Sequence, residues 1–326
     1  MWRGAIIGFG NVAEFGHWPG YAAHPEVEIV AVVDASAERR AQARRLRSSL
    51  GVFASSAELE KSAVDFVDIC TPPAVHAGPM LEAIARGWHV VCEKPFLLDQ
   101  AVLEEVRQES RRRGLAIIPV HNWKYAPIIR VATEQLREGG IGKLREVEIV
   151  TLRRRDAAVA DPSRPNWRRD PAVAGGGILM DHGWHALYLA LDFFGETPVD
   201  VSARLHRPND DAVEDEAIVE LQFPAGIARI ELSWNASVRA NRLRLVGTGG
   251  FISIDDRMLE VNGKTAQFEP GLSAGSHHAD WFAAMLPDVL GAFREPERSH
   301  PVFEEAAVCL RTIQRCYTCS GSLRPP

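Results

Sequence analysis

The sequence predicts an α/β protein: an N-terminal, doubly wound parallel sheet, followed by an α+β domain with a large, mostly antiparallel, open-faced sheet. Over about the first 120 residues, short apolar strand-like runs alternate with helix-like stretches, as in a parallel sheet. Farther on, alternating strands follow one another with no helices between them, which favours antiparallel pairing. We therefore expect two domains, residues 1–122 and 123–326.

The composition is that of a globular protein, with 46% hydrophobic and 25% charged residues in a chain of 326. A formal charge of -6 gives no electrostatic reason to expect nucleic acid. No apolar run is long enough for a membrane span, and strand-like sequence from Arg3 leaves no room for a signal peptide. Five scattered cysteines suit reduced thiols and a cytoplasmic location. We expect the lone CxxC, Cys316 and Cys319, to be structural, because no zinc or redox partners are evident.

A glycine-rich turn follows the first predicted strand, Arg3–Ile7. In this GxGxxA pattern Gly8 permits a tight turn, Gly10 lets the backbone approach a pyrophosphate, and Ala13 lets a helix pack closely on the strand. The next helix would offer free amide groups and its positive dipole end to phosphates. We therefore expect a dinucleotide-binding loop made by Gly8, Phe9, Gly10, Asn11, Val12 and Ala13.

The second predicted strand, Val27–Val33, ends at Asp34. An acid about twenty residues after the glycines is expected to hydrogen-bond a ribose 2′-hydroxyl. The same carboxylate would repel a 2′-phosphate, so NAD is favoured over NADP. Arg39 and Arg40, in a basic helix-like stretch over Ala37–Leu50, keep NADP open as an alternative.

A further strand, Val64–Cys70, ends in the rigid turn Thr71-Pro72-Pro73, after a short helix that Ser55 and Glu58 would open as a capping box. Thr71, Pro72 and His76 would then lie at the carboxyl edge of the sheet, near the cofactor. The alternative for His76 is an ordinary loop or helix-start histidine.

The strand His89–Cys92 ends abruptly in Glu93-Lys94-Pro95, after the predicted helix Ala77–Arg86. Ligands of such sheets bind just outside the carboxyl ends of the strands, so Lys94 would enter the ligand crevice, with Glu93 beside it. Pro95 favours an extended Lys94. The alternative is a strand-end turn with a solvated lysine. A helix over Asp99–Arg113, with Asp99 as N-cap, and a strand over Leu115–Val120 complete the first domain.

The second half begins with residues 121–127, followed by a helix-like stretch over Ile128–Glu138. Hairpin connections are expected at residues 224–226 and 248–250. The final helix, Phe303–Ser320, is a candidate to pack back on the first domain. The expected strands are Lys143–Arg155, Val199–Arg207, Glu216–Phe223, Ile227–Ser237, Arg242–Val246 and Phe251–Asp255.

Three glycines, residues 175–177, are expected to form a flexible lead-in to a helix that starts near Leu179. On one helix Asp181 and His185 share a face, and a carboxylate there can orient an imidazole that serves as a general base. The alternative is an ordinary ion pair. A metal set with His182 is disfavoured, because its side chain points about a third of a turn away and no HExxH is present.

These motifs together resemble the glucose–fructose oxidoreductase / inositol dehydrogenase (Gfo/Idh/MocA) family, over nearly the whole chain. They are GxGxxA, residues 17–19 and 71–73, Glu93-Lys94-Pro95, and the glycines followed by Asp181 and His185. The resemblance implies a Rossmann domain, an NAD or NADP cofactor, and an open sheet that mediates a dimer or tetramer. It also implies hydride transfer between nicotinamide and a carbinol carbon of a sugar, cyclitol or related polyol. Lys94 would then contact the reacting hydroxyl and the nicotinamide end, His185 would exchange the proton, and Asp181 would support His185.

Two departures from the family pattern affect the substrate. Tyr188 stands where members often carry an aspartate, and Lys124-Tyr125-Ala126-Pro127 replaces an arginine–aromatic pair before proline. Asn122, Lys124 and Tyr125 would line the substrate side, because they leave the last strand beside Lys94. Trp167 could stack on a sugar face while Arg168 or Arg169 meets an anionic group. Alternatively, that loop packs against a neighbouring subunit.

Two other functions remain open. One is NAD-assisted elimination or glycoside cleavage, in which hydride is lent and returned. The other is a non-catalytic dinucleotide sensor, although a sensor has no need to keep Lys94, Asp181 and His185 together.

Overall fold

The computed structural model describes residues 1–59, 64–157 and 166–322. Contacts between residues divide them into two compact units. The first comprises Met1–Asn122 and His277–Ala307, and the second comprises residues 123–157, 166–276 and 308–322. The first unit is therefore built from two separate stretches of the chain.

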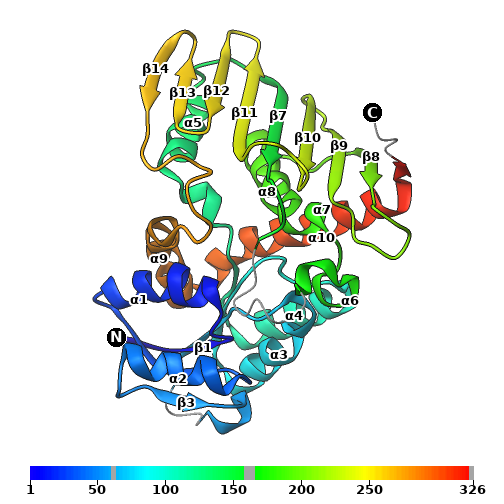
Figure 1. Cartoon of the computed structure of the whole chain (residues 1–326). Coiled ribbons are helices and arrows are strands. Elements are labelled where there is room, and N and C mark those ends of the chain that lie inside the picture. Colours follow the sequence, from blue (N-terminus) through cyan, green and yellow to red (C-terminus); the bar gives the residue numbers. More distant parts are fainter. Residues whose placement is uncertain (60–63, 158–165, 323–326) are drawn as a thin grey trace. The chain divides into compact units, whose positions relative to one another are not determined.

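A six-stranded parallel sheet forms the centre of the first unit (Figure 1), in the order β3-β2-β1-β4-β5-β6. The chain starts in the middle at β1, runs outward to β3, and then continues on the other side of β1. This reversal confirms the doubly wound sheet and creates a switch point between β1 and β4, where such folds bind ligands. The strands are Trp2–Ile7, Val27–Val33, Gly51–Phe53, Phe66–Ile69, His89–Cys92 and Ile117–Pro119.

The helices of the first unit start where the sequence signals place them. Ser36 caps α2 by accepting the backbone N–H of Arg39. Ser55 and Glu58 form the capping box of η2, and Asp99 accepts two first-turn amides of α4. Among the described residues before 122, the helices are η1 Ala13–His17, α1 Trp18–Ala23, α2 Ala37–Leu46, η2 Ser56–Glu58, η4 Pro73–Val75, α3 Ala77–Arg86 and α4 Gln100–Arg113.

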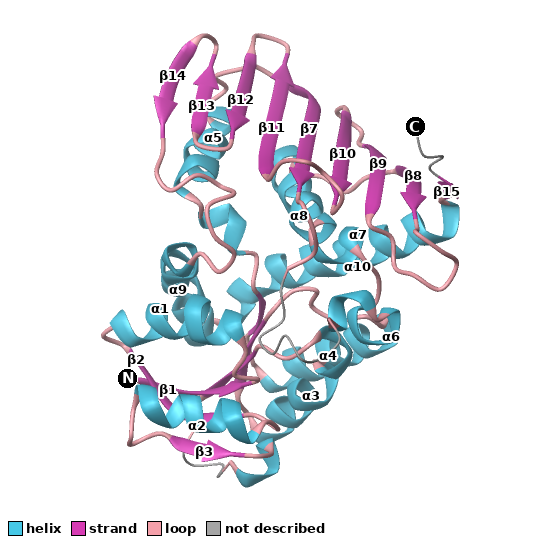
Figure 2. Ribbon diagram, viewed as in Figure 1, coloured by secondary structure: helices cyan, strands magenta, loops and turns pink. Residues whose placement is uncertain are grey.

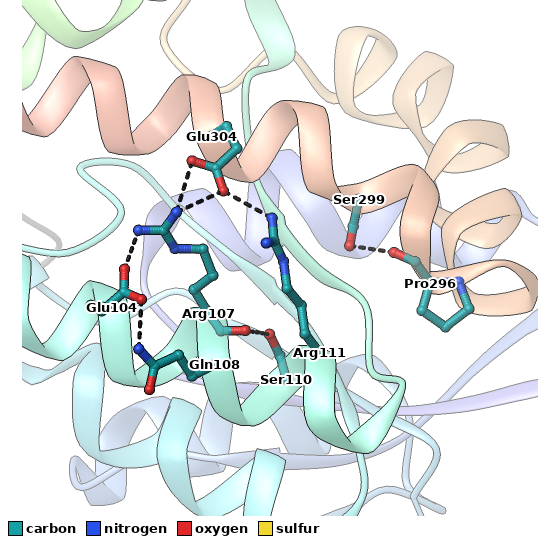
Figure 3. Close-up of polar contacts among 8 residues, drawn as sticks. All are labelled: Glu104, Arg107, Gln108, Ser110, Arg111, Pro296, Ser299 and Glu304. Carbon is teal, nitrogen blue, oxygen red and sulfur yellow. Dashed lines mark hydrogen bonds and ion pairs between the residues drawn. The ribbon is translucent and has the colours of Figure 1, made fainter.

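The second stretch of the first unit contains α9 (Ala279–Arg294), η7 (Pro296–Ser299) and the start of α10 (His300–Cys319). Figure 3 shows how the start of α10 is fixed to α4. The carboxylate of Glu304 lies 3.2 Å from the guanidinium of Arg107 and 2.9 Å from that of Arg111. Apolar contacts add to these ion pairs, since Phe303 meets Phe96 edge to face. Residues far apart in sequence thus complete one core.

Nine strands form the sheet of the second unit, drawn in magenta in Figure 2, in the order β14-β13-β12-β11-β7-β10-β9-β8-β15. The sheet is mostly antiparallel, as predicted; the pairs β7–β10 and β8–β15 are parallel. Both expected hairpins are present, β9–β10 and β11–β12. The strands are Leu144–Leu152, Asp200–His206, Glu216–Gln222, Ile227–Ser233, Ala240–Gly247, Phe251–Asp255, Met258–Val261, Lys264–Gln267 and Gly321–Ser322.

The two faces of this sheet differ in character. Helix α8 (Gly183–Phe194) packs on β7 and β10, and nearly all of its residues are buried. Alternate residues on the opposite face are exposed and charged, such as Arg229 between Glu146 and Glu220 at 3.5 and 3.3 Å. The other helices are η5 Asn122–Tyr125, α5 Pro127–Arg137, η6 Trp167–Arg169, α6 Pro171–Ala174 and α7 Ile178–Asp181.

Within the described ranges, no helix combines the length and apolar character that crossing a bilayer requires.

Candidate functional site

The glycine-rich turn after β1 has the geometry that the sequence predicts. Gly8 adopts a left-handed φ of 89°, and a Cβ there would lie 2.8 Å from Cγ2 of Thr71. A Cβ on Gly10, in contrast, would have no neighbouring atom within 4 Å. Gly8 is thus required by the packing of the protein itself, whereas the open space beside Gly10 suits a phosphate group.

Asp34 closes this turn from the end of β2. Its Oδ2 accepts the backbone N–H of Phe9 at 2.7 Å, and its Oδ1 accepts that of Ser36 at 2.7 Å. Farther along the loop, Asn11 accepts a side-chain hydrogen bond from Arg39 at 3.4 Å. The carboxylate therefore shapes the loop as well as placing negative charge at the expected ribose position.

The start of the helix after the turn is irregular. Val12 precedes a π-helical turn, η1, in which Ala13 is fully buried and His17 points inward. The buried Ala13 allows the close approach of helix and strand that the sequence predicts.

Thr71 lies directly against Gly8, at the end of β4. Its hydroxyl oxygen is buried and has no hydrogen-bond partner within the described part of the chain. A buried, unsatisfied hydroxyl calls for an explanation, and a polar group bound beside Gly8 supplies one. Pro72, the next residue, is half-buried in the same loop. The loop thus fits a bound dinucleotide.

His76 is fully buried behind this loop. One ring nitrogen, Nε2, lies 2.7 Å from the carbonyl oxygen of Thr71, and the other, Nδ1, lies 3.0 Å from that of Phe96. Burial lowers the pKa of His76, against the opposing effect of these carbonyl groups. The ring therefore braces the loop, and a direct contact with the cofactor stays a prediction.

Glu93 connects Lys94 to a buried histidine. One carboxylate oxygen of Glu93 accepts the backbone N–H of Lys94 at 3.0 Å, and the other lies 3.0 Å from Nε2 of His17. The second ring nitrogen of His17 lies 2.7 Å from the carboxylate of Asp68. Glu93, His17 and Asp68 thus form a hydrogen-bonded network that holds the backbone of the half-buried Lys94.

This network favours a charged histidine. Burial lowers the pKa of His17, but the charge of Asp68, its hydrogen bond to the ring and the neighbouring Cys70 together outweigh that effect, so the pKa lies well above 6.5. Burial raises the pKa of Glu93, but the hydrogen bond from His17, the charge of His17 and the contacts with Lys94 together outweigh that effect and lower the pKa. With Cys70, His17 and Asp68 are the one group of three potential metal-ligating side chains gathered within the described ranges. The 2.7 Å between the His17 ring and the Asp68 carboxylate is a hydrogen-bond distance, so these two groups bond to each other directly.

In the second unit, Gly176 and Gly177 are tightly packed, so the flexible lead-in expected from the sequence is wrong for these two glycines. A Cβ on Gly176 would lie 1.9 Å from the hydroxyl of Tyr317, and one on Gly177 would lie 1.9 Å from the carbonyl oxygen of Glu214. The buried Glu214 carboxylate accepts the N–H groups of Gly177 and Leu179 at 2.9 and 3.0 Å, and the Tyr317 hydroxyl at 2.9 Å. Glu214 thus caps the start of α7.

The prediction that one helix carries both Asp181 and His185 is also wrong, because a one-residue turn at His182 separates α7 from α8. Asp181 lies at the end of α7, with its carboxylate 3.6 Å from Nε of Arg168 and 3.5 Å from Nδ1 of His182. The interruption means that helical spacing alone does not define how Asp181 faces His185.

His185 lies in the first turns of α8 and is buried. Its Nδ1 is 2.8 Å from the hydroxyl oxygen of Tyr188, which also accepts the backbone N–H of Trp123 at 3.1 Å. The indole of Trp123 stacks on the imidazole, with 4.8 Å between centroids and 20° between planes. The ring of His185 is therefore fixed in position and orientation.

The predicted substrate residues fall into two groups. Asn122, Lys124 and Tyr125 lie together in η5, where the ammonium group of Lys124 is 3.3 Å from Asp192. Trp167 and Arg168 lie in η6, with the guanidinium of Arg168 over the Trp167 ring at 4.3 Å. Arg168 therefore occupies one face of the ring on which a sugar was expected to stack.

Several of these partners were missed by sequence reasoning. His17 and Asp68 are separated from Glu93 by long stretches of chain, so no local pattern joins them. Tyr188 was noted as a departure from the family pattern, and its spacing of three from His185 was the available signal, since such residues are neighbours on a helix.

Comparison with known proteins gives two matching family models. The model described as "Oxidoreductase family, NAD-binding Rossmann fold" matches residues 2–121, and the model described as "GFO/IDH/MocA C-terminal domain" matches residues 129–253.

Two relatives and two solved structures illustrate the similarity. The dTDP-3,4-didehydro-2,6-dideoxy-alpha-D-glucose 3-reductase of Streptomyces antibioticus is 30% identical over 263 residues, 78% of this chain and 75% of the relative. The D-glucoside 3-dehydrogenase of Escherichia coli K12 is 29% identical over 76% of this chain and 74% of its own.

Among solved structures, a protein from gentamicin A biosynthesis in complex with NAD has a TM-score of 0.84 at 24% identity, covering 98% of this chain and 93% of the other. A 3-ketoreductase from Actinomadura kijaniata, in complex with NADP and TDP-benzene, has a TM-score of 0.83 at 22% identity, with 99% of both chains covered. At these identities the likeness concerns the fold.

Proposed function

Because this chain belongs to the GFO/IDH/MocA family of NAD-binding oxidoreductases, we propose that it transfers hydride between nicotinamide and a carbinol carbon of a sugar, cyclitol or related polyol. Membership confirms the family resemblance, the oxidoreductase class and the NAD(P) cofactor predicted from the sequence. The observation that carries the proposal is the turn at Gly8 and Gly10, which is tightly packed on one side and open on the other.

The residues of the first unit fit a dinucleotide. We propose that Gly8–Ala13 bind the pyrophosphate, that Asp34 faces the ribose, and that Thr71 and Pro72 contact the cofactor farther along. His76 and Glu93 are proposed to hold this edge of the site. When bound, the nicotinamide accepts or supplies the hydride. The protein positions cofactor and substrate and provides the electrostatic environment of the reaction.

Two side chains are proposed to handle the hydroxyl. His185 exchanges its proton, as a positioned general base or acid, and Asp181 supports the ring electrostatically. Lys94 stabilises alkoxide character with its ammonium group. The fixed ring of His185 supports this role, because a proton acceptor has to be held within hydrogen-bond reach of its substrate.

Names of relatives suggest the position oxidised. The Streptomyces relative is named as a sugar 3-reductase and the Escherichia coli relative as a glucoside 3-dehydrogenase. We propose that the reacting carbon here is likewise carbon 3 of a pyranose. Asn122, Lys124 and Tyr125 are proposed to contact the sugar, together with Trp167 and Arg168.

The test is reduced-nicotinamide absorbance with NAD and NADP in parallel, across free aldoses, glucosides, inositols and the corresponding 3-keto sugars. Reduced cofactor that appears with a glucoside, and not with its 3-deoxy analogue, would support both the reaction and the position. If a substrate is converted while the amount of reduced cofactor stays constant, the proposal would be replaced by an elimination in which hydride is lent and returned.

The cofactor preference follows from the charges near Asp34. We propose that NAD is favoured, because the carboxylate of Asp34 repels a 2′-phosphate. Arg39 and Arg40 lie in the adjacent helix, where Arg40 donates to the carbonyl oxygen of Asp34 at 2.8 Å. If NADP is used as well, Arg39→Gln should reduce its kcat/KM more than that of NAD; equal reductions would contradict this assignment.

We also propose a cytoplasmic homo-oligomer, a dimer or tetramer formed through the open face of the second unit's sheet. That face carries both signs of charge in alternation, with Arg229 between Glu146 and Glu220, so two copies can be mutually complementary. Light scattering of the wild type and of Arg229→Glu tests it, and a wild-type monomer would contradict it. The five free thiols favour a reducing compartment.

A further inference from the structure

The hydroxyl of Tyr188 joins two parts of the second unit. Tyr188 is fully buried in α8, one helical turn after His185. Its oxygen lies 2.8 Å from Nδ1 of His185 and accepts the backbone N–H of Trp123 at 3.1 Å. Both distances are those of good hydrogen bonds. One phenol oxygen thus meets two nitrogens at once.

These two contacts limit the hydrogen-bond arrangements at this oxygen. A backbone N–H only donates, so Trp123 occupies one acceptor site of the phenol oxygen. Toward His185 two arrangements remain: the phenol donates its proton to Nδ1, or the phenol accepts a proton carried by Nδ1. In the first arrangement the neutral imidazole carries its proton on Nε2, and in the second it carries it on Nδ1.

Only the second arrangement lets His185 exchange protons through Nε2. With the proton on Nδ1, Nε2 of the neutral ring carries no proton and can take one. The hydrogen bond from Nδ1–H to Tyr188 is then the same before and after this proton transfer. With the proton already on Nε2, a gained proton would have to go to Nδ1, against the phenol O–H. The stack of Trp123 on the ring, 4.8 Å between centroids, opposes the ring flip that would exchange the nitrogens.

We propose that Tyr188 is a positioning residue that accepts Nδ1–H of His185 and thereby keeps Nε2 as the nitrogen that exchanges a proton with substrate. This inference rests on the proposed role of His185. In this arrangement the neutral phenol oxygen accepts from both the Trp123 amide and Nδ1–H of His185, and the phenol O–H donates to an acceptor other than His185. The buried site gains no additional negative charge.

The direct test is a ¹H–¹⁵N correlation spectrum of the whole protein labelled with ¹⁵N-histidine, recorded above the pH range in which exposed histidines titrate. His185→Gln identifies the signals of His185. A protonated Nδ1 with a bare Nε2 in the wild type is the expected result. A protonated Nε2 would overturn the proposal whatever the activity of the protein.

Three variants separate the two roles of the hydroxyl. Tyr188→Phe offers neither donor nor acceptor, and Tyr188→Asp offers only acceptors. We expect the Nδ1 proton to be retained in Tyr188→Asp and the tautomers to mix in Tyr188→Phe. Tyr317→Phe deletes a buried hydroxyl from α10 in the same unit, and the tautomer of His185 should be unchanged in it. A tautomer shift of equal size in Tyr317→Phe would contradict a specific role for Tyr188.

Kinetics supply a second readout. Loss of the correct tautomer should reduce kcat roughly 10²-fold in Tyr188→Phe with little change in KM, because substrate contacts are kept. An unchanged kcat beside an altered tautomer would contradict the positioning role. If instead His185→Gln itself is fully active, the proposed role of His185 fails, while the spectrum still reports whether Tyr188 sets the tautomer.

Discussion

The imidazole ring of His17 lies flat against the phenyl ring of Phe282, with 3.8 Å between ring centroids and 8° between ring planes. Phe282 belongs to α9, so this stack joins the helix after the glycine turn to a segment far along the chain. The same imidazole lies between the carboxylates of Asp68 and Glu93. One side chain therefore links packing of the first unit to the backbone of Lys94.

We expect His17→Gln to destabilise the protein by roughly 3–5 kcal/mol near neutral pH, the cost of breaking a buried ionic network. Because the pKa of His17 in the folded protein lies well above 6.5, its contribution is fully present below about pH 6.5 and is lost as the pH rises through the folded pKa. Urea unfolding over a series of pH values should show the gap between wild type and variant narrowing toward alkaline pH. A gap that is constant with pH would refute the charged histidine.

Gly10→Ala should fold normally and bind cofactor poorly. A Cβ at Gly10 meets no protein atom within 4 Å, so it occupies only the space assigned to the pyrophosphate. We expect NADH affinity, measured by calorimetry, to fall at least about tenfold, or about 1.4 kcal/mol. Gly78→Ala is the matched control, because a Cβ there also meets nothing and the position is in α3. Equal NADH affinity in the two variants would disprove the assignment.

Glu214→Ala should loosen the start of α7. The variant leaves the N–H groups of Gly177 and Leu179 without their acceptor, and a buried donor left unsatisfied costs about 1–3 kcal/mol. Tm should fall, and hydrogen exchange of these amides should accelerate. Tyr317→Phe removes only one of the three donors to this carboxylate and should have a smaller effect. Unaltered exchange at Gly177 would show that the cap does not stabilise this turn.

Arg168→Met should impair activity more than Arg169→Met. Arg168 places its guanidinium beside Asp181, whereas Arg169 pairs with Asp156 at 3.0 Å. Without Arg168 the carboxylate of Asp181 loses a partner that holds it, and we expect kcat/KM to fall about tenfold, which is about 1.4 kcal/mol in transition-state stabilisation. Steady-state kinetics of both variants decide the matter, and equal losses would count against a role for the pair of Arg168 and Asp181.

Elements with strong local signals were predictable from sequence. The helix Ala77–Arg86 and the strand Val27–Val33 have the predicted bounds, because an apolar pattern and a clear end define each. Strands β13 and β14 were missed, since they are short and β14 is exposed throughout, which leaves no buried face to produce a pattern. Helix α9 was also missed, although its buried face covers His17.

The site was predictable in its residue types and less so in its contacts. Asp34, Lys94 and His185 were found because motifs fix their place in the chain. Asp181 was expected to support His185, which stays a prediction, and the contact that the sequence did not indicate is the phenol of Tyr188 beside Nδ1 of that ring. The glycines before α7 were attributed to flexibility, but Gly177 is required by a carbonyl oxygen of Glu214, more than thirty residues away, which local sequence cannot reveal.

The first unit is assembled from Met1–Asn122 and His277–Ala307, and this has a consequence for recombination of such genes. A fragment cut after residue 122 would carry the glycine turn and the sheet but would lack Phe282, so the ionic network around His17 would be uncovered. Exchange of cofactor domains between related enzymes therefore needs both segments from one parent. A chimera joined at a single crossover would pair a histidine from one ancestor with a phenylalanine from another.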